Sequence, residues 1–400
     1  MGSRAHGPRG LTPVLLDLRT SDGTRGRAAL DATAALRALE ATGHPRPILL
    51  PYHPANPSPY LDLLYSTALE EGVAAVPLAR ITDAAGLVPL AEISGARVVL
   101  HLHWLGKVLD GATDMATALR QVTAYSGELD ALRAASVGLA WTVHNILPHG
   151  ATLPDAEIAL RRAVVAHADV VHVMSAATEA LVAHQFTIPD GRVLAVPHPS
   201  MESLYPRWMS RAEARRRLDV PGSARVIGML GALQPYKGLE DLLDAIPDAV
   251  ARVPGLRVVV AGAPDPGEEM QRLVDRAVAD PRVMIHPRHV ADADLQVIMR
   301  AADAVVVPYR DVLNSASLML ALAFGRRVIF PRHPALAEFE GAGVAVTYEG
   351  GRPGALAAGI AEALSLPEDG VAEAARAICE ARDAARLGRA FASGLQARIP

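Results

Sequence analysis

Short apolar runs alternate with longer segments of helical periodicity, and this alternation constrains the fold of the chain more than any other feature. The predicted strands of the first half are residues 13–18, 46–52, 74–79, 97–104, 139–145, 170–175 and 192–198. Those of the second half are residues 225–231, 256–262, 282–287, 303–309, 326–331 and 343–348. Helical patterns between the strands include residues 58–72, 114–135, 155–168 and 176–186. Because alternating strands and helices are typical of βαβ units, the sequence predicts an α/β protein with two Rossmann-like parallel sheets.

The strand pattern is interrupted once, in residues 203–225, where polar residues and prolines replace it. Domain boundaries fall in such stretches, so we expect a first domain at 1–220 and a second at 221–384. A chain of 400 residues is also longer than one hydrophobic core normally supports. The last segment, 385–400, has a helical pattern, and we expect it to cross back to the first domain.

Composition narrows the class of protein. Half of the residues are hydrophobic, 20% are charged and the net charge is −4, which suits a folded protein without bulk attraction for nucleic acid. The single cysteine, Cys379, excludes an intramolecular disulfide and a cysteine-based zinc site, and it favours the cytoplasm. No apolar run reaches the roughly 18 residues that a membrane-spanning helix needs. We therefore expect a cytoplasmic protein, with peripheral contact to a membrane and the oligomeric state left open.

Lysine is almost absent from the chain. Of the 39 basic residues, only Lys107 and Lys237 are lysines. Lys237 lies in "MLGALQPYKGLEDLL" (229–243), where a buried strand ends at Gly231 and a helix follows Gly238. Anions bind beside helix N-termini at the carboxyl ends of parallel strands, and an ammonium group is a compact point charge for phosphate. We predict that Lys237 binds a phosphate group; the alternative is a solvated loop cation.

A second strand-to-helix junction has the same pattern. A predicted strand ends at Tyr309, and the polar "RDVLNSAS" precedes an apolar helix. The backbone amides from Asn314 to Ser317 are expected to bind an anion, so that two helix starts face one diphosphate. The alternatives are that Asn314 or Ser315 is only an N-cap, and that Arg310 is a surface cation instead of a further phosphate partner.

Histidines collect where predicted strands of the first half end. They are His101, His103, His144, His149, His172 and His198. Because ligands bind at that edge of a parallel sheet, we select His144 with Asn145, whose side chains can hydrogen-bond sugar hydroxyls and stabilise developing charge. Histidines that only stabilise the core or a loop are the alternative. Zinc at His101, His103, His144 and His149 is disfavoured, since no HExxH motif or carboxylate set accompanies them, and we expect no metal.

Three segments resemble a known enzyme family. They are "VHNILPHG" (143–150), "GALQPYKGLEDLLDAI" (231–246) and "PYRDVLNSASLMLALAFGRRVIFP" (308–331). Together with the two Rossmann-like halves, they look like the GT-B glycosyltransferases, specifically glycosyltransferase family 4 and its close relatives, over nearly the whole chain after residue 45. The resemblance implies two domains facing across a cleft, with a nucleotide-sugar on the second and the acceptor on the first. It also implies hexosyl transfer without metal or cofactor, by front-side attack with retention of anomeric configuration.

The resemblance further implies roles for single residues. His144 would position the sugar, and Lys237 would neutralise the departing diphosphate. The implied donor-binding residues are Gly231, Gln234, Lys237, Val290, Tyr309, Asn314, Ser315, Ala316 and Ser317. The implied acceptor-binding residues are His103, Trp104, Asn145 and, in "NPSPYLDLLY" (56–65), the pairs Asn56 with Pro57 and Tyr60 with Leu61. The acceptor would be a polysaccharide, a lipid-linked sugar or a hydroxylated secondary metabolite.

The chain departs from the family pattern at charged positions. Family members often carry arginine in the loop before the lysine, where this chain has Ala232, Leu233 and Gln234. The paired glutamates of the family would fall near Val312 and at Leu320. Two other functions therefore stay open. One is a nucleotide-sugar-binding pseudoenzyme or partner subunit, and the other is a GT-B-type epimerase or phosphorylase.

Overall fold

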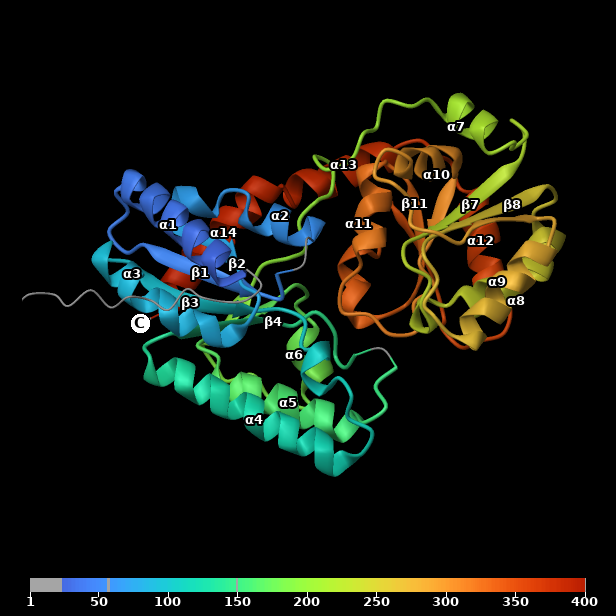
Figure 1. Cartoon of the computed structure of the whole chain (residues 1–400). Coiled ribbons are helices and arrows are strands. Elements are labelled where there is room, and N and C mark those ends of the chain that lie inside the picture. The colour runs from blue at the N-terminus through green and yellow to red at the C-terminus, as the bar shows by residue number, and fades with distance from the viewer. Residues whose placement is uncertain (1–23, 56–57, 149, 400) are drawn as a thin grey trace, which may run out of the picture.

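The computed structural model describes residues 24–55, 58–148 and 150–399, and each half of the chain contains one parallel six-stranded sheet (Figure 1). The first sheet has the order β2-β1-β3-β4-β5-β6 and the second the order β12-β11-β10-β7-β8-β9. The strands of the first sheet are β1 (Ile48–His53), β2 (Val73–Pro77), β3 (Arg97–Leu102), β4 (Gly138–Thr142), β5 (Val170–Val173) and β6 (Val193–Ala195). Those of the second are β7 (Arg225–Leu230), β8 (Leu256–Ala261), β9 (Val283–His286), β10 (Ala304–Val306), β11 (Arg327–Pro331) and β12 (Ala345–Tyr348).

Helices cover both faces of each sheet. In the first half they are α1 (Thr24–Thr42), α2 (Pro59–Tyr65), α3 (Val88–Ile93), α4 (Met115–Ala134), α5 (Pro154–His167) and α6 (Thr178–Val182). In the remainder they are α7 (Arg211–Arg217), α8 (Leu239–Arg252), α9 (Glu268–Ala279), α10 (Leu295–Ala301), α11 (Ala316–Ala323), α12 (Ala355–Ser365), α13 (Val371–Ala381) and α14 (Ala384–Arg398). The predicted α/β class with two tandem Rossmann-like sheets is confirmed.

Successive residues of the strands point to opposite sheet faces, and both faces are buried. In β1, Leu49 packs in the core that includes α4 and α5, whereas Ile48 and Leu50 pack in the core that includes α2 and α14. Parallel sheets covered on both faces have continuous apolar strands, which is why the apolar runs predicted the strands well. Each predicted strand within the described ranges has its counterpart, and the predicted strand at residues 13–18 lies outside them.

The predicted helix at residues 58–72 is wrong in extent. Helix α2 ends at Tyr65, and a separate short 3-10 helix follows at Ala68–Glu71. The Ser66 hydroxyl donates a hydrogen bond to the Leu63 carbonyl at 2.9 Å. A serine side chain that bonds the backbone in this way competes with the helix, so the apolar periodicity continues while the helix does not.

The C-terminal helix α14 returns to the first half of the chain, as predicted. Figure 1 shows this red helix among the blue elements of the first half. Its residues Leu387, Phe391 and Leu395 are buried in the core beneath β1 and β3. A Cβ on Gly388 would lie 2.7 Å from the Thr67 hydroxyl oxygen, so only glycine allows this close approach between α14 and the segment after α2.

The predicted domain boundary at residue 220 remains a prediction. Helix α7 precedes that position, yet Met209 and Ala214 pack with Val297 and Ala301 of α10 in the second half. No helix within the described ranges combines the length and the apolar character that crossing a membrane requires.

The second sheet has a topological switch point between β7 and β10. Its order corresponds to the Rossmann order 3-2-1-4-5-6, in which the strands on either side of the first strand connect in opposite directions. Ligands of such sheets bind in the crevice at the carboxyl ends of the two strands. Lys237 lies in the loop after β7, and Asn314 and Ser315 lie in the loop after β10, directly before α11.

Candidate active site

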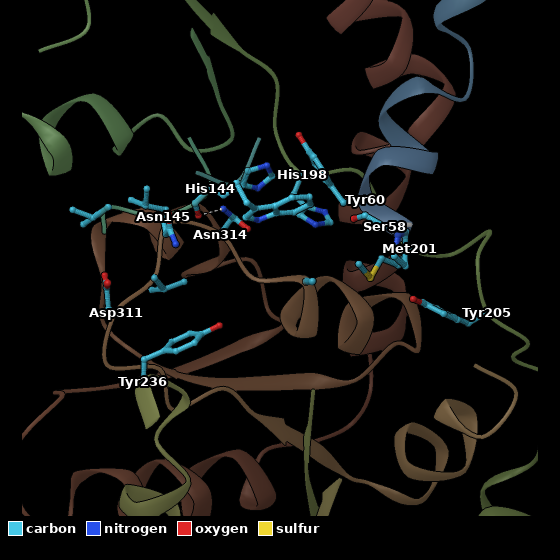
Figure 2. Close-up of a pocket in the computed structure, with 16 residues that line it drawn as sticks. Ser58, Tyr60, His144, Asn145, His198, Met201, Tyr205, Tyr236, Asp311 and Asn314 are labelled. Carbon is cyan, nitrogen blue, oxygen red and sulfur yellow. Dashed lines mark hydrogen bonds between the residues drawn. The ribbon is translucent and has the colours of Figure 1, made fainter. Parts of the chain in front are cut away.

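A cavity of about 360 Å³ lies between the two halves, beside the carboxyl ends of both sheets. Its lining residues are Ser58, Pro59, Tyr60, Trp104, His144, Asn145, Ile146, His198, Met201, Tyr205, Tyr236, Asp311, Val312, Leu313, Asn314 and Ala316. Figure 2 shows side chains from both halves around one space, with Tyr205 and Asp311 at opposite ends of the view. Since ligands of parallel sheets bind at this edge, the cavity is the candidate active site.

The loop after β7 brings the scarce lysine to this region. Residues Pro235–Lys237 form a 3-10 turn, and Gly238 follows with a φ angle of 72°. That left-handed conformation favours glycine, and a Cβ on Gly238 would overlap the carbonyl oxygen of Pro308. The backbone amide of Arg310 also donates to the carbonyl of Tyr236 at 2.8 Å. The loops after β7 and β10 therefore pack directly against each other.

The Lys237 ammonium group lies near the start of α11. A Cβ placed on Gly231 would lie 3.0 Å from Lys237 Nζ and 3.0 Å from Ser317 Oγ, so the amine and the hydroxyl border the same small space. The amine also lies 5.6 Å from the ring centroid of Tyr309 and 5.9 Å from that of Tyr236. In the described part of the chain no carboxylate forms an ion pair with Lys237. An ammonium group without an internal counter-ion is available to an anionic ligand.

Hydroxyl groups attach the first turn of α11 to the end of β7. Tyr309 donates to Ser317 Oγ at 2.9 Å, and Ser317 donates to the carbonyl of Leu230 at 2.8 Å. The hydroxyl of Ser315 accepts from the amide of Leu318 at 3.1 Å, so Ser315 is the N-cap of the helix. The other amides of the first turn point out of the helix start, where the helix dipole favours an anion.

Arg310 is engaged elsewhere. Its guanidinium group forms ion pairs with Glu240 at 2.9 Å and with Asp241 at 2.7 Å, on the exposed side of α8. These contacts support the alternative that Arg310 is a surface cation, and they leave Lys237 as the basic group beside the start of α11.

His144 follows the end of β4 and lies at the cavity. Its ring stacks on the Trp104 indole, with centroids 4.3 Å apart and ring planes 19° apart, and it meets the edge of Tyr60 at 5.3 Å. Burial, reinforced by the neighbouring His172 and His198, holds the pKa of His144 well below its usual value. The imidazole is therefore neutral at physiological pH, and it can exchange hydrogen bonds with a ligand without carrying charge.

Asn145 is held by a buried ion pair. The guanidinium group of Arg161 contacts Asn145 Oδ1 at 3.4 Å and pairs with the Glu157 carboxylate at 2.7 Å. Arg161 is 2% exposed, so the pair is shielded from solvent. The Asn145 side chain is therefore presented to the cavity by a rigid support from α5.

Comparison with known proteins shows that the chain is similar to glycosyltransferases. The sequence family described as "Glycosyl transferases group 1" matches residues 224–366, which include the second sheet. The GDP-mannose:glycolipid 4-beta-D-mannosyltransferase of Xanthomonas campestris is 29% identical over 343 residues, which are 83% of this chain and 88% of that protein. The D-inositol 3-phosphate glycosyltransferase of Corynebacterium efficiens is 30% identical over 178 residues, 42% of each chain.

Solved structures show the same two-sheet architecture. Anabaena HepE in complex with UDP superposes with a TM-score of 0.61 at 17% identity, covering 88% of this chain and all of that one. Sucrose-phosphate synthase from Thermosynechococcus elongatus gives a TM-score of 0.61 at 16% identity, with the same coverage. The chain is a GT-B glycosyltransferase. The expected arrangement of two Rossmann-like domains facing across a cleft is thereby confirmed.

The glycosyltransferase brings many of the predicted residues together at the cavity. Tyr60, Trp104, His144, Asn145, Asn314 and Ala316 line it. Gly231, Lys237, Tyr309, Ser315 and Ser317 lie next to it, around the start of α11. His103 lies behind His144, 2% exposed and hydrogen-bonded to its ring.

Other predicted residues do not line the cavity of the glycosyltransferase. Gln234 and Val290 are absent from its lining, and Leu61 is buried in the core between α2 and the first sheet. Asn56, Pro57 and His149 lie outside the described residues. Leu320, at the family's second glutamate position, is buried in the core of the second domain, whereas Val312 lines the cavity.

The sequence did not indicate several residues of the site. Met201 and Tyr205 come from the segment that connects the two sheets, where no strand or helix pattern exists, and Asp311 follows β10. Near these residues the sequence indicated only His198, as one of the histidines at the ends of predicted strands. Within the described ranges, no group of three or more histidine, cysteine, aspartate or glutamate side chains has an arrangement that could hold a metal ion.

Proposed function

We propose that this glycosyltransferase moves a hexose from a nucleotide-sugar to an acceptor hydroxyl, without a metal ion and with retention of anomeric configuration. The observation that carries the proposal is the Lys237 ammonium group, which borders the same space as Ser317 at the start of α11 and has no ion-pair partner among the described residues. A nucleoside diphosphate leaves readily once its charge is neutralised. The ammonium group and the helix start supply that positive potential, which a divalent ion supplies in other phosphate chemistry.

The proposed donor lies across the second sheet at its switch point. Its diphosphate contacts Lys237 and the first turn of α11, and its sugar extends into the cavity toward His144 and Asn145. The nucleoside extends toward the loops after β7 and β9, where Gln234 and Val290, respectively, are proposed contacts. Support comes from HepE, whose solved structures contain UDP and UDP-glucose, and from the relative named for GDP-mannose.

The proposed acceptor binds on the first domain. Trp104 is 38% exposed although it lines the cavity, and an exposed aromatic face beside polar groups suits the apolar face of a sugar ring. Tyr60 and His144 border the same region. Because one relative is named for a glycolipid acceptor, a lipid-linked sugar presented at a membrane surface is the first acceptor class to test.

Retention is proposed with the leaving phosphate as the base. An inverting transfer needs a separate base, and within the described lining the carboxylate of Asp311 is the one acidic side chain. Asp311 lies on the second domain, in the loop after β10. A front-side reaction would instead use the donor's own phosphate oxygen, which Lys237 and the helix start hold in place.

The proposal is tested by donor binding and then by turnover. GDP-mannose, UDP-glucose and the free diphosphates should raise the melting temperature of the purified protein, since ligands that bind the native state stabilise it. With a lipid-linked sugar present and EDTA added, the nucleoside diphosphate should be released and the product should have the donor's anomeric configuration. If no nucleotide shifts the melting temperature, the proposal is wrong.

The same assay separates the alternative functions. A pseudoenzyme or partner subunit would bind nucleotide-sugar without releasing diphosphate. An epimerase would turn over without acceptor, and a phosphorylase would depend on inorganic phosphate. A product of opposite anomeric configuration would leave the transferase activity standing and overturn retention.

A further inference from the structure

A continuous chain of hydrogen bonds connects four histidines beneath the cavity. It begins at the Val196 carbonyl, which lies 2.8 Å from His172 Nε2. His172 Nδ1 lies 3.1 Å from the hydroxyl oxygen of Thr142, and this oxygen lies 2.8 Å from His101 Nε2. His172, Thr142 and His101 have no measurable exposure, so this part of the chain is sealed from solvent.

The chain continues through a tyrosine to the cavity. The Tyr65 hydroxyl lies 2.7 Å from His101 Nδ1 and 2.8 Å from His103 Nε2. His103 Nδ1 lies 3.0 Å from His144 Nε2. His144 lines the cavity. Its other ring nitrogen, Nδ1, has no hydrogen-bond partner among the described residues, and this atom is not buried.

The histidines of this hydrogen-bond chain are neutral. Burial lowers the pKa of His172 to about 4 and holds those of His101 and His103 well below the usual value, and the neighbouring histidines lower the latter two further. A neutral imidazole has one N–H group and one lone pair, and a hydroxyl group has one hydrogen. Each contact in the chain therefore needs one donor and one acceptor, and each choice fixes the next.

The Val196 carbonyl determines the direction of the first contacts. A carbonyl oxygen only accepts, so His172 has its proton on Nε2 and a lone pair on Nδ1. The Thr142 hydroxyl must then donate to His172, and its oxygen accepts from His101 Nε2. His101 Nδ1 is consequently a lone pair, and it accepts the hydroxyl hydrogen of Tyr65.

The same logic reaches His144. The Tyr65 oxygen accepts from His103 Nε2, which leaves His103 Nδ1 as an acceptor for the Nε2–H group of His144. We infer that this hydrogen-bond chain fixes His144 as the Nε2–H tautomer and presents its Nδ1 lone pair to the ligand in the cavity.

The reverse direction leaves one contact unsatisfied. If every bond from Thr142 to His144 were reversed, the Thr142 hydroxyl would donate to His101, and its oxygen would face the lone pair of His172 at 3.1 Å. The Tyr60 hydroxyl, 3.4 Å from His172 Nδ1, could then donate to that nitrogen, but the repulsive contact with Thr142 would remain. Buried polar contacts without a donor are costly, so the forward direction is the stable one.

This inference rests on the proposed function for its consequence. A lone pair at His144 Nδ1 accepts a hydrogen bond from a sugar hydroxyl, and it repels groups that only accept, such as a fluorine or methyl ether in place of that hydroxyl. Thr142, Tyr65 and His103 are then positioning residues, since they act on the sugar through His144. The chain ends at a carbonyl, so it orients His144 and offers no route by which a proton reaches solvent.

The test measures the tautomer directly. In protein labelled with 15N-histidine, long-range proton–nitrogen correlation spectra distinguish a protonated from an unprotonated ring nitrogen, and the His144→Gln spectrum identifies the His144 signals. The expected result is an unprotonated Nδ1 and a protonated Nε2 at neutral pH. A protonated Nδ1 in the unmodified protein overturns the inference, and this measurement needs no substitution in the hydrogen-bond chain.

Two substitutions at one position supply matched variants. Thr142→Val removes the hydroxyl at nearly constant volume and should give a mixture of His144 tautomers, whereas Thr142→Ser keeps the hydroxyl and should keep the Nε2–H form. An unchanged His144 signal in Thr142→Val would show that the chain does not set the tautomer. Turnover by Thr142→Val should fall about tenfold, the effect of one lost buried hydrogen bond, with partial or full recovery in Thr142→Ser.

The spectra and the turnover assay fail independently. If the expected tautomer is found and no sugar is transferred, the chain stands and the proposed function is wrong. Alternatively, sugar transfer is found while Thr142→Val changes the tautomer but neither the turnover nor the discrimination against a donor with fluorine in place of the sugar hydroxyl. That result would overturn the role of the lone pair in ligand binding.

Discussion

The side-chain amide of Asn314 donates a hydrogen bond to the backbone carbonyl of His144 across a distance of 2.9 Å. The two residues are 170 positions apart in the sequence and belong to different domains. Both line the cavity, where Figure 2 shows them close together. This bond therefore links the start of α11, where we place the diphosphate, to the loop after β4, where we place the sugar.

Removal of this bond should weaken catalysis more than folding. Asn314→Ala is expected to raise the KM for the donor or lower kcat by roughly two- to tenfold, the range of one hydrogen bond of about 0.5–1.5 kcal/mol. Asn314→Asp should be worse, because a carboxylate repels the His144 carbonyl. Steady-state kinetics with thermal denaturation as the control measures both effects. Unchanged kinetics in both variants would show that the contact has no part in the reaction.

The Lys237 ammonium group should be required for donor binding and not for folding. Lys237→Ala is expected to weaken nucleotide-sugar binding roughly 10- to 100-fold, the range for a lost hydrogen bond to a charged group, while the melting temperature of the free protein changes little. Lys237→Arg should recover only part of the affinity, since the flat guanidinium group does not fit the space of the amine. Calorimetric titration with donor measures the loss, and full recovery by arginine would contradict the assigned geometry.

A substitution at Gly231 independently tests where the Lys237 amine lies. Its φ angle is 126°, and a Cβ there would lie 3.0 Å from both Lys237 Nζ and Ser317 Oγ. Gly231→Ala should therefore displace the amine and weaken donor binding. Gly191→Ala is the matched control, because Gly191 also has a positive φ angle, of 78°, but no atom lies within 4 Å of its added Cβ. Equal donor affinity in both variants would contradict the assigned position of the amine.

A substitution at Asp311 distinguishes a retaining from an inverting transfer. If the leaving phosphate is the base, Asp311→Asn should lower kcat by less than about tenfold, because the carboxylate then contributes only to the field in the cavity. If Asp311 is the base of an inverting transfer, the loss should exceed about 100-fold, the usual lower range for general base catalysis. The anomeric configuration of the product, read by NMR, must agree with the kinetic result; a large loss with an inverted product would overturn retention.

The sequence predicted the sheets well because both faces of each strand are buried. It overestimated strand length at the site: residues 97–104 and 139–145 were predicted, but β3 ends at Leu102 and β4 at Thr142. The residues beyond those ends leave the sheet to line or support the cavity, and among them are Trp104 and His144. Apolar patterning cannot mark that departure, because Trp104 and Val143 are as apolar as strand residues.

Contacts between distant segments were beyond prediction. The approach of Asn314 to His144 depends on how the two domains pack, and Tyr65 reaches His101 and His103 only because α2 packs against the first sheet. The position of Lys237 could be predicted because its loop is local: a strand end, a glycine and a helix start determine where the amine lies. Local geometry was predictable from residue types, and the arrangement between domains was not.

The buried histidines predict a loss of stability on mild acidification. His172 and His198 have pKa values of about 4 in the folded protein because they are buried, against about 6.5 when exposed in the unfolded chain. Between these values the unfolded state binds more protons than the native state, so the free energy of unfolding falls as pH falls through 6.5 toward 4. Each histidine contributes up to about 1.4 kcal/mol per pH unit in this window.

Urea denaturation at pH 7.5, 6.5 and 5.5 should show the decrease in the free energy of unfolding. His184→Gln, which removes an exposed histidine, should leave this decrease unchanged. Stability that stays constant down to pH 5 would contradict the neutral, buried state of the cluster.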